Sequence, residues 1–151
     1  MAPKEAKTKP NRGLGDFLCF AVYSANLAFG RAYKPILEQF GLTYPQYIAL
    51  VALWEEDRQT VGGLGEKLFL ESNTLTPLLK KLEGMGYVRR ERAAADERQV
   101  VVSLTDAGRR LREKISTTNL VQASGLDPEE FRRMRKSVAT LRDNLIAATE
   151  Q

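Results

Sequence analysis

The chain has 151 residues, of which 43% are hydrophobic and 28% charged, and its formal net charge is +4. These values are typical of a single globular domain with its own core. The chain contains no histidine and one cysteine, Cys19, which excludes Ser-His and Cys-His catalysis, histidine metal sites and cysteine-cluster metal sites. We therefore expect a protein that is not an enzyme and binds no cofactor. Because no signal peptide and no long apolar run is present, the expected location is cytoplasmic.

The N-terminal region predicts a basic tail followed by a long helix. Residues 1–12 combine lysines with prolines and predict a disordered tail. Residues 14–40 predict one helix that ends at Gly41. Asp16 is a candidate N-cap, which would place Cys19 in the first turn, where the helix dipole favours a thiolate. Apolar side chains occur on more than one face of this helix, so we expect a partner subunit to bury part of it.

Two shorter helices are predicted next. The first begins at Thr43 or Tyr44 and has Pro45 in its first turn. Its predicted buried face comprises Tyr47, Leu50, Val51 and Trp54. The second is capped by Thr60 and runs to Leu68. Its three glycines weaken it, so it must be held by packing against its neighbours.

The stretch 71–86 predicts the helix around which the fold is organised. Its apolar stripe comprises Leu75, Leu78, Leu79, Leu82 and Met85. The other side carries small hydrogen-bonding side chains and a cation, which suit the edge and backbone of a DNA groove. The predicted DNA-contacting residues here are Ser72, Asn73, Thr74, Thr76, Pro77 and Lys80. A start at Ser72 or Asn73 keeps Pro77 close to the first turn. Taken alone, the stretch also fits an ordinary amphipathic surface helix.

A basic hairpin follows this helix directly. Residues 87–92 and 99–104 predict two strands, and 93–98 predict a polar turn between them. The hairpin carries Arg89, Arg90, Arg92 and, at its tip, Arg98. We expect Arg90 and Arg98 to contact DNA and Asp96 to support the wing. A helix followed by a basic hairpin is the layout of a winged helix-turn-helix, so the predicted fold is mainly α with a small β-hairpin wing.

The C-terminal part predicts two helices separated by a break at 119–127. Thr105 caps the first helix, whose inward residues are Ala107, Leu111 and Ile115. The second begins at Pro128 and runs to about Ala148. It carries a heptad seam made of Phe131, Met134, Val138, Leu141, Leu145 and Ala148. Packing within the chain would also explain this seam.

The two ends of the chain together favour a homodimer. We expect a single domain at 13–151, in which 14–42 and 105–150 form the dimer interface. The middle section, 43–104, would then bind double-stranded DNA, with two copies displayed symmetrically over a pseudo-palindromic operator.

Several short motifs resemble one known family. The layout resembles the MarR family of winged-helix dimers, and particular motifs resemble its organic-hydroperoxide-sensing branch, OhrR. The motifs are Leu-Cys-Phe-Ala-Val-Tyr at 18–23, Tyr-Lys-Pro at 33–35, Leu-Thr-Tyr-Pro-Gln-Tyr at 42–47, Thr-Leu-Thr-Pro-Leu-Leu-Lys at 74–80 and Asp-Glu-Arg at 96–98. The resemblance covers about 14–148. The early cysteine combined with the two tyrosine motifs is more specific than the Asp-Glu-Arg wing.

The resemblance implies a redox-sensing repressor. In that branch the residue matching Cys19 is the peroxide sensor, and those matching Tyr33 and Tyr44 hydrogen-bond its thiolate across the dimer interface. Tyr23 and Tyr47 are further candidates for this pocket. Because no cysteine follows Cys19, the chain resembles the one-cysteine members. An organic hydroperoxide would oxidise Cys19, a small thiol would form a mixed disulfide, and the repressor would leave its operator.

Two other functional interpretations remain open. The first is a MarR-like repressor that a small aromatic ligand releases, with Cys19 a small hydrophobic residue of no special role. The second is a thiol peroxidase that uses Cys19. Sustained turnover would need a resolving cysteine or an activating histidine, and the chain has neither.

Overall fold

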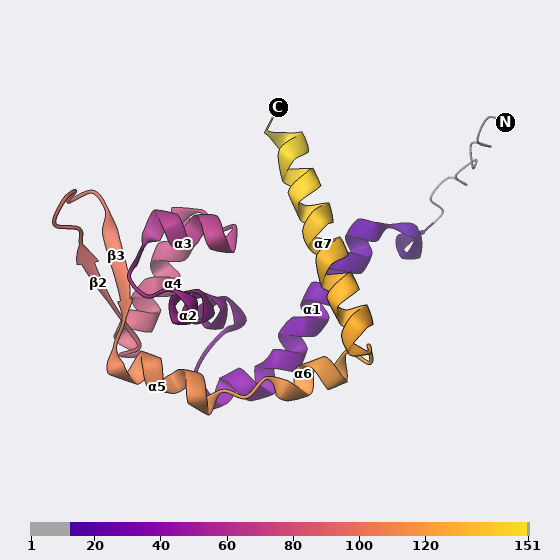
Figure 1. The fold of residues 1–151 in the computed structure, drawn as a ribbon, viewed down its shortest axis with the longest axis horizontal. Helices are drawn as coiled ribbons and strands as arrows, with labels where there is room; N and C mark the ends of the chain where they lie inside the picture. Colours follow the sequence, from indigo (N-terminus) through magenta and orange to yellow (C-terminus); the bar gives the residue numbers. More distant parts are fainter. Residues whose placement is uncertain (1–12, 151) are drawn as a thin grey trace.

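The computed structural model describes residues 13–150, without the side chains of residues 118 and 119, and it is mainly helical with one small sheet. Figure 1 shows a winged region at one side and two long crossing helices at the other, joined along one edge. The predicted tail at 1–12 lies outside the described residues. Between residues 13 and 150, no helix combines the length and the apolar character needed to cross a bilayer.

The first long helix begins later than the sequence predicts. This part of the chain consists of η1 (Leu14–Asp16), α1 (Leu18–Leu37) and η2 (Glu38–Phe40). Phe17 is the N-cap of α1, with extended backbone and no side-chain cap bond, so the predictions of one continuous helix and of Asp16 as its cap are wrong. Gly13 and Gly15 lower the helix propensity at this end, and the extended backbone of Phe17 separates η1 from α1. Gly41 adopts a φ of 68°, the left-handed conformation that ends the helical segment as predicted.

The next section builds the first half of the winged region. It consists of α2 (Tyr44–Glu55), β1 (Gln59–Thr60) and α3 (Val61–Leu68). Thr43 is the N-cap of α2, and its backbone N–H donates to Gln46 Oε1 over 2.9 Å. The predicted cap of α3 is confirmed, because the Thr60 hydroxyl accepts the Gly63 N–H over 3.0 Å. The short strand β1 was not predicted.

The second half comprises α4 (Ser72–Gly84), β2 (Val88–Arg92) and β3 (Val100–Leu104). The predicted hairpin is confirmed, with Arg90 opposite Val102 in an antiparallel register. β1 adds a third strand, so the sheet order is β1-β3-β2. It is held partly by Gln59, whose buried Nε2 donates to the Ala52 carbonyl over 2.9 Å.

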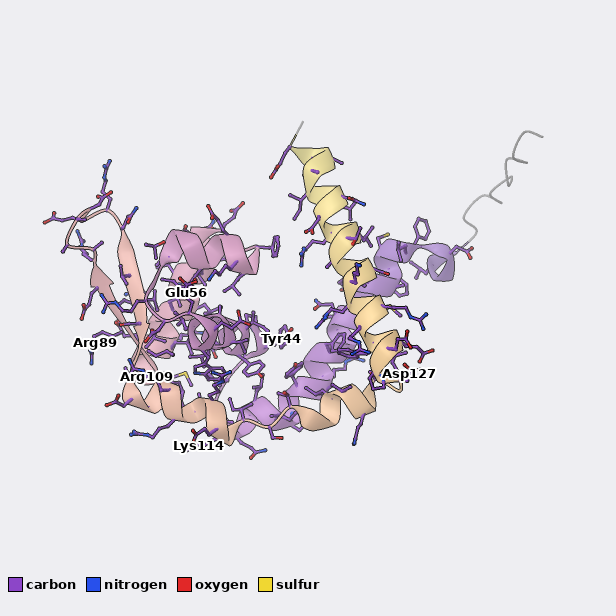
Figure 2. All side chains as sticks on the ribbon, viewed as in Figure 1. Tyr44, Glu56, Arg89, Arg109, Lys114 and Asp127 are labelled. Carbon is purple, nitrogen blue, oxygen red and sulfur yellow. The ribbon has the colours of Figure 1, made fainter. Side chains whose placement is uncertain are left out.

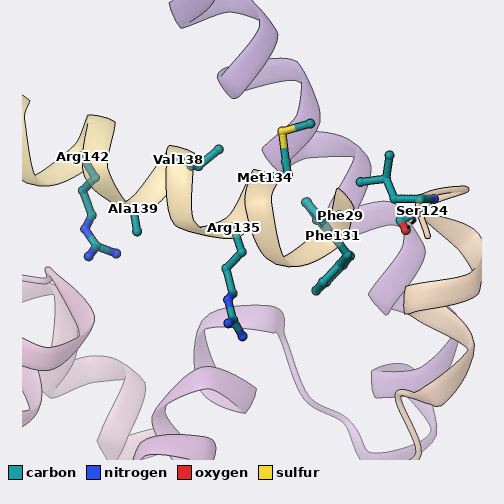
Figure 3. Close-up of a pocket in the computed structure, with 9 residues that line it drawn as sticks. Phe29, Ser124, Phe131, Met134, Arg135, Val138, Ala139 and Arg142 are labelled. Atoms are coloured by element: carbon teal, nitrogen blue, oxygen red, sulfur yellow. Dashed lines mark hydrogen bonds between the residues drawn. The ribbon is translucent and has the colours of Figure 1, made fainter. Parts of the chain in front are cut away.

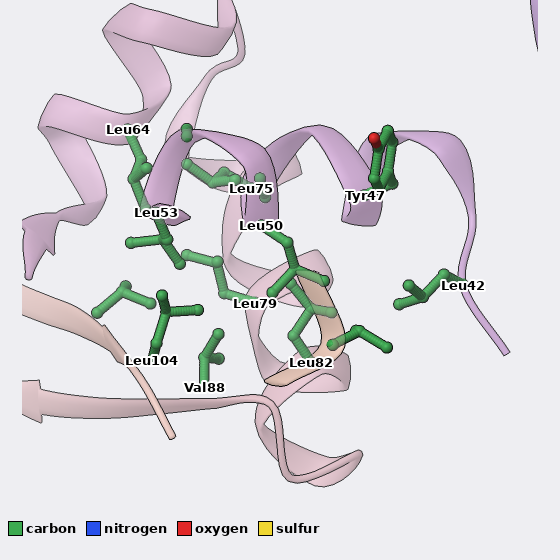
Figure 4. Close-up of a cluster of buried hydrophobic side chains, with 14 of the residues drawn as sticks. Leu42, Tyr47, Leu50, Leu53, Leu64, Leu75, Leu79, Leu82, Val88 and Leu104 are labelled. Atoms are coloured by element: carbon green, nitrogen blue, oxygen red, sulfur yellow. The ribbon is translucent and has the colours of Figure 1, made fainter. Parts of the chain in front are cut away.

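One hydrophobic core holds the winged region together. Leucines from α2, α3 and α4 meet the inner face of the sheet (Figure 4). The fully buried side chains in this group are Leu50, Leu53, Leu64, Leu75, Leu79, Leu82, Val88 and Val102. Each buried leucine contributes about 1.5–3 kcal/mol relative to an exposed one. This packing fixes which face of α4 points outward.

The C-terminal section contains α5 (Asp106–Lys114), α6 (Thr118–Ala123) and α7 (Pro128–Thr149). Thr105 caps α5 as predicted, because its hydroxyl accepts the Gly108 N–H over 3.1 Å. The prediction of an unbroken irregular segment at 119–127 is wrong, since α6 occupies its first part. A helix of six residues leaves too short a pattern to read. Asp127 caps α7 by accepting the backbone N–H groups of Glu129 and Glu130, each over 2.9 Å.

Candidate nucleic-acid interface and thiol site

Helix α4 presents its polar side outward. Leu75, Leu79 and Leu82 are fully buried, so the opposite side of the helix faces away from the core. The exposed residues on that side are Ser72, Asn73, Thr74, Pro77 and Lys80, and Thr76 is half-buried. The N-cap residue, Glu71, makes no side-chain hydrogen bond to the first turn. The start of α4 is therefore open to an acceptor group from outside the chain.

Asp96 organises the tip of the wing. Its Oδ1 accepts the backbone N–H of Arg98 over 3.0 Å and lies 3.3 Å from Arg98 Nε. The Arg98 side chain is 92% exposed, so this ion pair contributes little to stability and leaves the cation accessible. Arg98 also lines a groove of about 380 Å³ between α4 and the wing, together with Ser72, Thr76 and Arg90. The structure thus brings four of the predicted DNA-contacting residues to one groove.

Arg90 is less exposed than the other predicted contact residues. Glu83 Oε2 accepts the Arg90 backbone N–H over 2.8 Å, and Glu83 Oε1 lies 3.5 Å from Arg90 Nε. The Arg90 side chain is 20% exposed, and within the described part of the chain its Nε has no hydrogen-bond partner. The neighbouring Arg89 is exposed on the outer side of the wing (Figure 2).

Cys19 lies in the first turn of α1 and is exposed in the single chain. It lines an open and largely apolar hollow of about 410 Å³, together with Leu14, Phe17, Phe20 and Tyr23. The rings of Phe20 and Tyr23 are 6.5 Å apart. Within one chain, therefore, Cys19 is not a core residue but part of an aromatic surface hollow.

Tyr33, Tyr44 and Tyr47 form an aromatic cluster at the junction of α1 and α2. The Tyr33 ring centroid is 4.9 Å from that of Tyr44 and 5.6 Å from that of Tyr47. Burial, reinforced by the neighbouring phenols, raises the pKa of Tyr33, and burial with the nearby Tyr47 raises the pKa of Tyr44. Both phenols therefore stay protonated at neutral pH and can donate an O–H group to an anion.

Within one chain, the structure does not bring Cys19 to these tyrosines. Cys19 and Tyr33 both lie in α1, and at about 1.5 Å per residue they are about 21 Å apart along its axis. Tyr23, one turn after Cys19, lines the same hollow, whereas Tyr47 belongs to the cluster with Tyr33. The predicted contact between thiolate and phenols therefore needs a second chain.

Comparison with known proteins identifies the family. A family model described as transcriptional regulator SarA/Rot matches residues 31–115. The chain is 48% identical over 138 residues to the HTH-type transcriptional regulator TtmR of Methylorubrum extorquens, covering 90% of this chain and 71% of that protein. It is 40% identical over 133 residues to the organic hydroperoxide resistance transcriptional regulator of Bacillus subtilis, covering 85% of this chain and 88% of that protein. The chain belongs to the MarR family and is an OhrR-type regulator.

Solved structures of MarR-family proteins share this fold. The structure of reduced AbfR bound to DNA has a TM-score of 0.77 and 39% identity, and the match covers 89% of this chain and 94% of that chain. Wild-type MarR of E. coli, in its apo form, has a TM-score of 0.67 at 22% identity, which supports the fold alone. The predicted winged helix-turn-helix fold is thus confirmed.

Contacts that the sequence did not predict hold α2 and the following turn to β3 and α5. Trp54 Nε1 donates to the Gly108 carbonyl over 2.9 Å. Asp57 Oδ1 accepts the Leu104 N–H over 2.8 Å, and its Oδ2 lies 3.2 Å from Arg109 Nη2. Burial acts to raise the pKa of Asp57, but the backbone N–H donors and the Arg109 guanidinium outweigh it and hold this pKa below its ordinary value. At this point the sequence shows only a run of three acidic residues, Glu55, Glu56 and Asp57.

Helix α7 leaves much of its predicted seam exposed in the single chain, although Phe131 and Leu141 are half-buried. Met134, Val138 and Leu145 are exposed, and α7 has no buried residue among those described. Figure 3 shows Met134 and Val138 on one side of α7 and Arg135 and Arg142 on the other, around an apolar cavity of about 360 Å³. The Arg142 guanidinium carbon lies 4.4 Å from the ring centroid of Phe69, in the turn between α3 and α4.

Proposed function

We propose that this protein is a homodimeric, DNA-binding transcriptional repressor that senses organic hydroperoxides through Cys19 and then releases its operator. The observation that carries the proposal is the position of Cys19. It is exposed in an aromatic hollow at one end of α1, and the other end of α1 carries the tyrosine cluster that joins the winged region. The related Bacillus subtilis protein is named for organic hydroperoxide resistance.

DNA binding is assigned to α4 and the wing. The polar side of α4 suits the major groove, and the exposed Arg98 suits the neighbouring minor groove. Asp96 orients Arg98 through the bond to its backbone N–H. Support comes from the DNA-bound structure of AbfR, which has the same fold.

Dimerisation is assigned to residues 14–42 and 105–150. The exposed apolar side chains of α1 and α7 have no cover within the described chain, and exposed apolar surface of this extent favours a partner. A second copy is the partner that would also bring Tyr33 and Tyr44 of one chain to Cys19 of the other. The dimer would display two copies of α4 about one DNA turn apart, roughly 34–36 Å.

The sensing step is an oxygen transfer to sulfur. The Cys19 thiolate attacks the terminal oxygen of the hydroperoxide, so an S–O bond forms while the O–O bond breaks. The electron pair leaves on the alkoxide, which takes a proton and departs as an alcohol, and the sulfur becomes a sulfenic acid. A small thiol then attacks the sulfenic acid sulfur and forms a mixed disulfide with Cys19. The hydroxyl group leaves as water. The added bulk separates the phenols from the sulfur and shifts the winged regions.

Replacement of the sulfur tests the proposal. Cys19→Ser retains a hydroxyl group of similar size, so operator binding should match that of the wild type in fluorescence anisotropy. An aromatic hydroperoxide should release wild-type protein and leave Cys19→Ser on the operator, with one peroxide consumed per wild-type chain. If the hydroperoxide released both proteins from the operator equally, Cys19 would not be the sensor. Many peroxides consumed per chain would instead indicate a peroxidase, and release of both proteins by an unreactive aromatic acid would indicate ligand gating.

A further inference from the structure

The groove between α4 and the wing combines features that suit a phosphate. It is lined by two cations, Arg90 and Arg98, and by the hydroxyl side chains of Ser72 and Thr76. The first turn of α4 opens beside it without a side-chain cap from Glu71. A helix start adds partial positive charge and N–H donors to the two guanidinium groups.

Arg90 is held differently from the exposed arginines of the wing. Its backbone N–H is bonded to Glu83 Oε2 over 2.8 Å, and its Nε faces Glu83 Oε1 at 3.5 Å. Arg90 also lines the groove, so its guanidinium group can donate to a ligand bound there. A side chain that is 20% exposed has lost part of its conformational freedom before any ligand binds.

We infer that this groove binds one phosphodiester of the DNA backbone through Arg90, and that Glu83 is the positioning residue for Arg90. Glu83 lies near the end of α4 and Arg90 lies in β2, so this single carboxylate also fixes the wing relative to the helix that reads the bases. The inference rests on the proposed operator binding and adds to it one phosphate contact and a residue that does not touch DNA.

If Glu83 acted only through its charge, the predicted effect of removing it on DNA affinity would be the opposite. A carboxylate close to a phosphate repels it, so its removal would then strengthen binding. If Glu83 positions Arg90, its removal weakens binding even though a negative charge is lost. Glu83→Gln separates the two roles, because the amide oxygen can still accept the Arg90 N–H while the charge is gone.

The salt dependence of operator binding is the readout. Each phosphate neutralised contributes about 0.9 to the slope of log K against log salt concentration. Arg90→Gln should reduce this slope by about one phosphate and weaken binding about tenfold at moderate salt. Glu83→Ala should reproduce both changes, whereas Glu83→Gln should retain the wild-type slope. Glu91→Ala is the matched control, because it removes an exposed carboxylate from the same strand and should leave the slope unchanged.

Three results would overturn the inference. They are an unchanged slope in Arg90→Gln, tighter binding by Glu83→Ala, or the same slope loss in Glu91→Ala. Thermal unfolding of each variant shows whether the winged region remains folded. If Glu83→Ala does not fold, Glu83→Gln takes its place, and tighter operator binding by Glu83→Gln would overturn the inference because it would show that the carboxylate only repels the phosphate. A wild-type protein that binds no operator would refute the proposed function itself, and it would be recognised before any variant is compared.

Discussion

A mixed dimer can show which chain supplies each half of the thiol site. Cys19 and Tyr33 are about 21 Å apart along α1, so in the proposed dimer the phenols that face Cys19 would come from the partner chain. We consider one chain that carries Cys19→Ser and a second that carries Tyr33→Phe and Tyr44→Phe. In their heterodimer, the remaining Cys19 of the second chain faces the intact tyrosines of the first. It should therefore react with hydroperoxide as fast as the wild type.

The expected difference in rate follows from the lost hydrogen bonds. A hydrogen bond to a charged group contributes about 1.5–3 kcal/mol, so losing one phenol removes about that much stabilisation from the sulfur anion that attacks the peroxide. A less stabilised sulfur anion is a stronger nucleophile, which recovers roughly half of this loss in reaction rate on a logarithmic scale. The homodimer of the tyrosine variant should thus react at least about 3- to 10-fold more slowly than the wild type.

Differently tagged chains and intact-mass measurement of Cys19 oxidation provide the assay. The reciprocal heterodimer pairs a wild-type chain with one that carries all three substitutions. Its single Cys19 faces two phenylalanines and should react slowly. A slow first heterodimer together with a fast reciprocal one would mean that each Cys19 depends on the tyrosines of its own chain, which would refute the geometric argument.

Three further predictions concern the fold and the assembly. Gly108→Ala would place a Cβ against the Tyr87 carbonyl oxygen, closer than any real contact, so it should lower stability by at least about 3 kcal/mol in thermal unfolding. Gly62→Ala has open space around it and should not destabilise the protein. The pKa of Asp57 is depressed in the folded chain, so the ionised Asp57 stabilises the fold above about pH 4, and this stabilisation is lost as the pH falls through the folded pKa. In denaturant titrations, the difference in unfolding free energy between wild type and Asp57→Asn should therefore shrink in acid. Leu141→Glu introduces a charge into the α7 seam and should abolish the dimer in sedimentation analysis, and an unchanged dimer would move the interface elsewhere.

The fold was predictable wherever a short-range pattern decides the structure. The leucine stripe of α4 and the switch to period two after Gly86 predicted the reading helix and the wing. Thr60 and Thr105 predicted two helix starts, because a cap depends only on residues two or three positions away. Pro45 marked the first turn of a third helix.

The features that the sequence did not predict are very short elements or contacts between residues far apart in the chain. β1 is two residues long, and its pairing with β3 depends on residues more than forty positions away. Asp57 contacts Leu104 and Arg109, and no local pattern points to those partners. Glu83 looked like an ordinary polar residue of α4, because its role appears only when β2 folds back onto the end of the helix. Predicting Asp16 as a cap relied on residue type alone, and Phe17 occupies that position.

In the proposed mechanism, oxidation of one sulfur atom affects a DNA-binding surface far from it. α1 carries Cys19 at one end and Tyr33 at the other, and the Tyr33 ring packs on the first turn of α2. Trp54, near the far end of α2, is hydrogen-bonded to α5, and Asp57, just after α2, is hydrogen-bonded to β3. A close-packed core moves as a body and not by gradual deformation, so a shift of α1 at its tyrosine end should turn the whole winged region. Loss of operator binding then needs no change inside α4, only a new angle between the two copies of it.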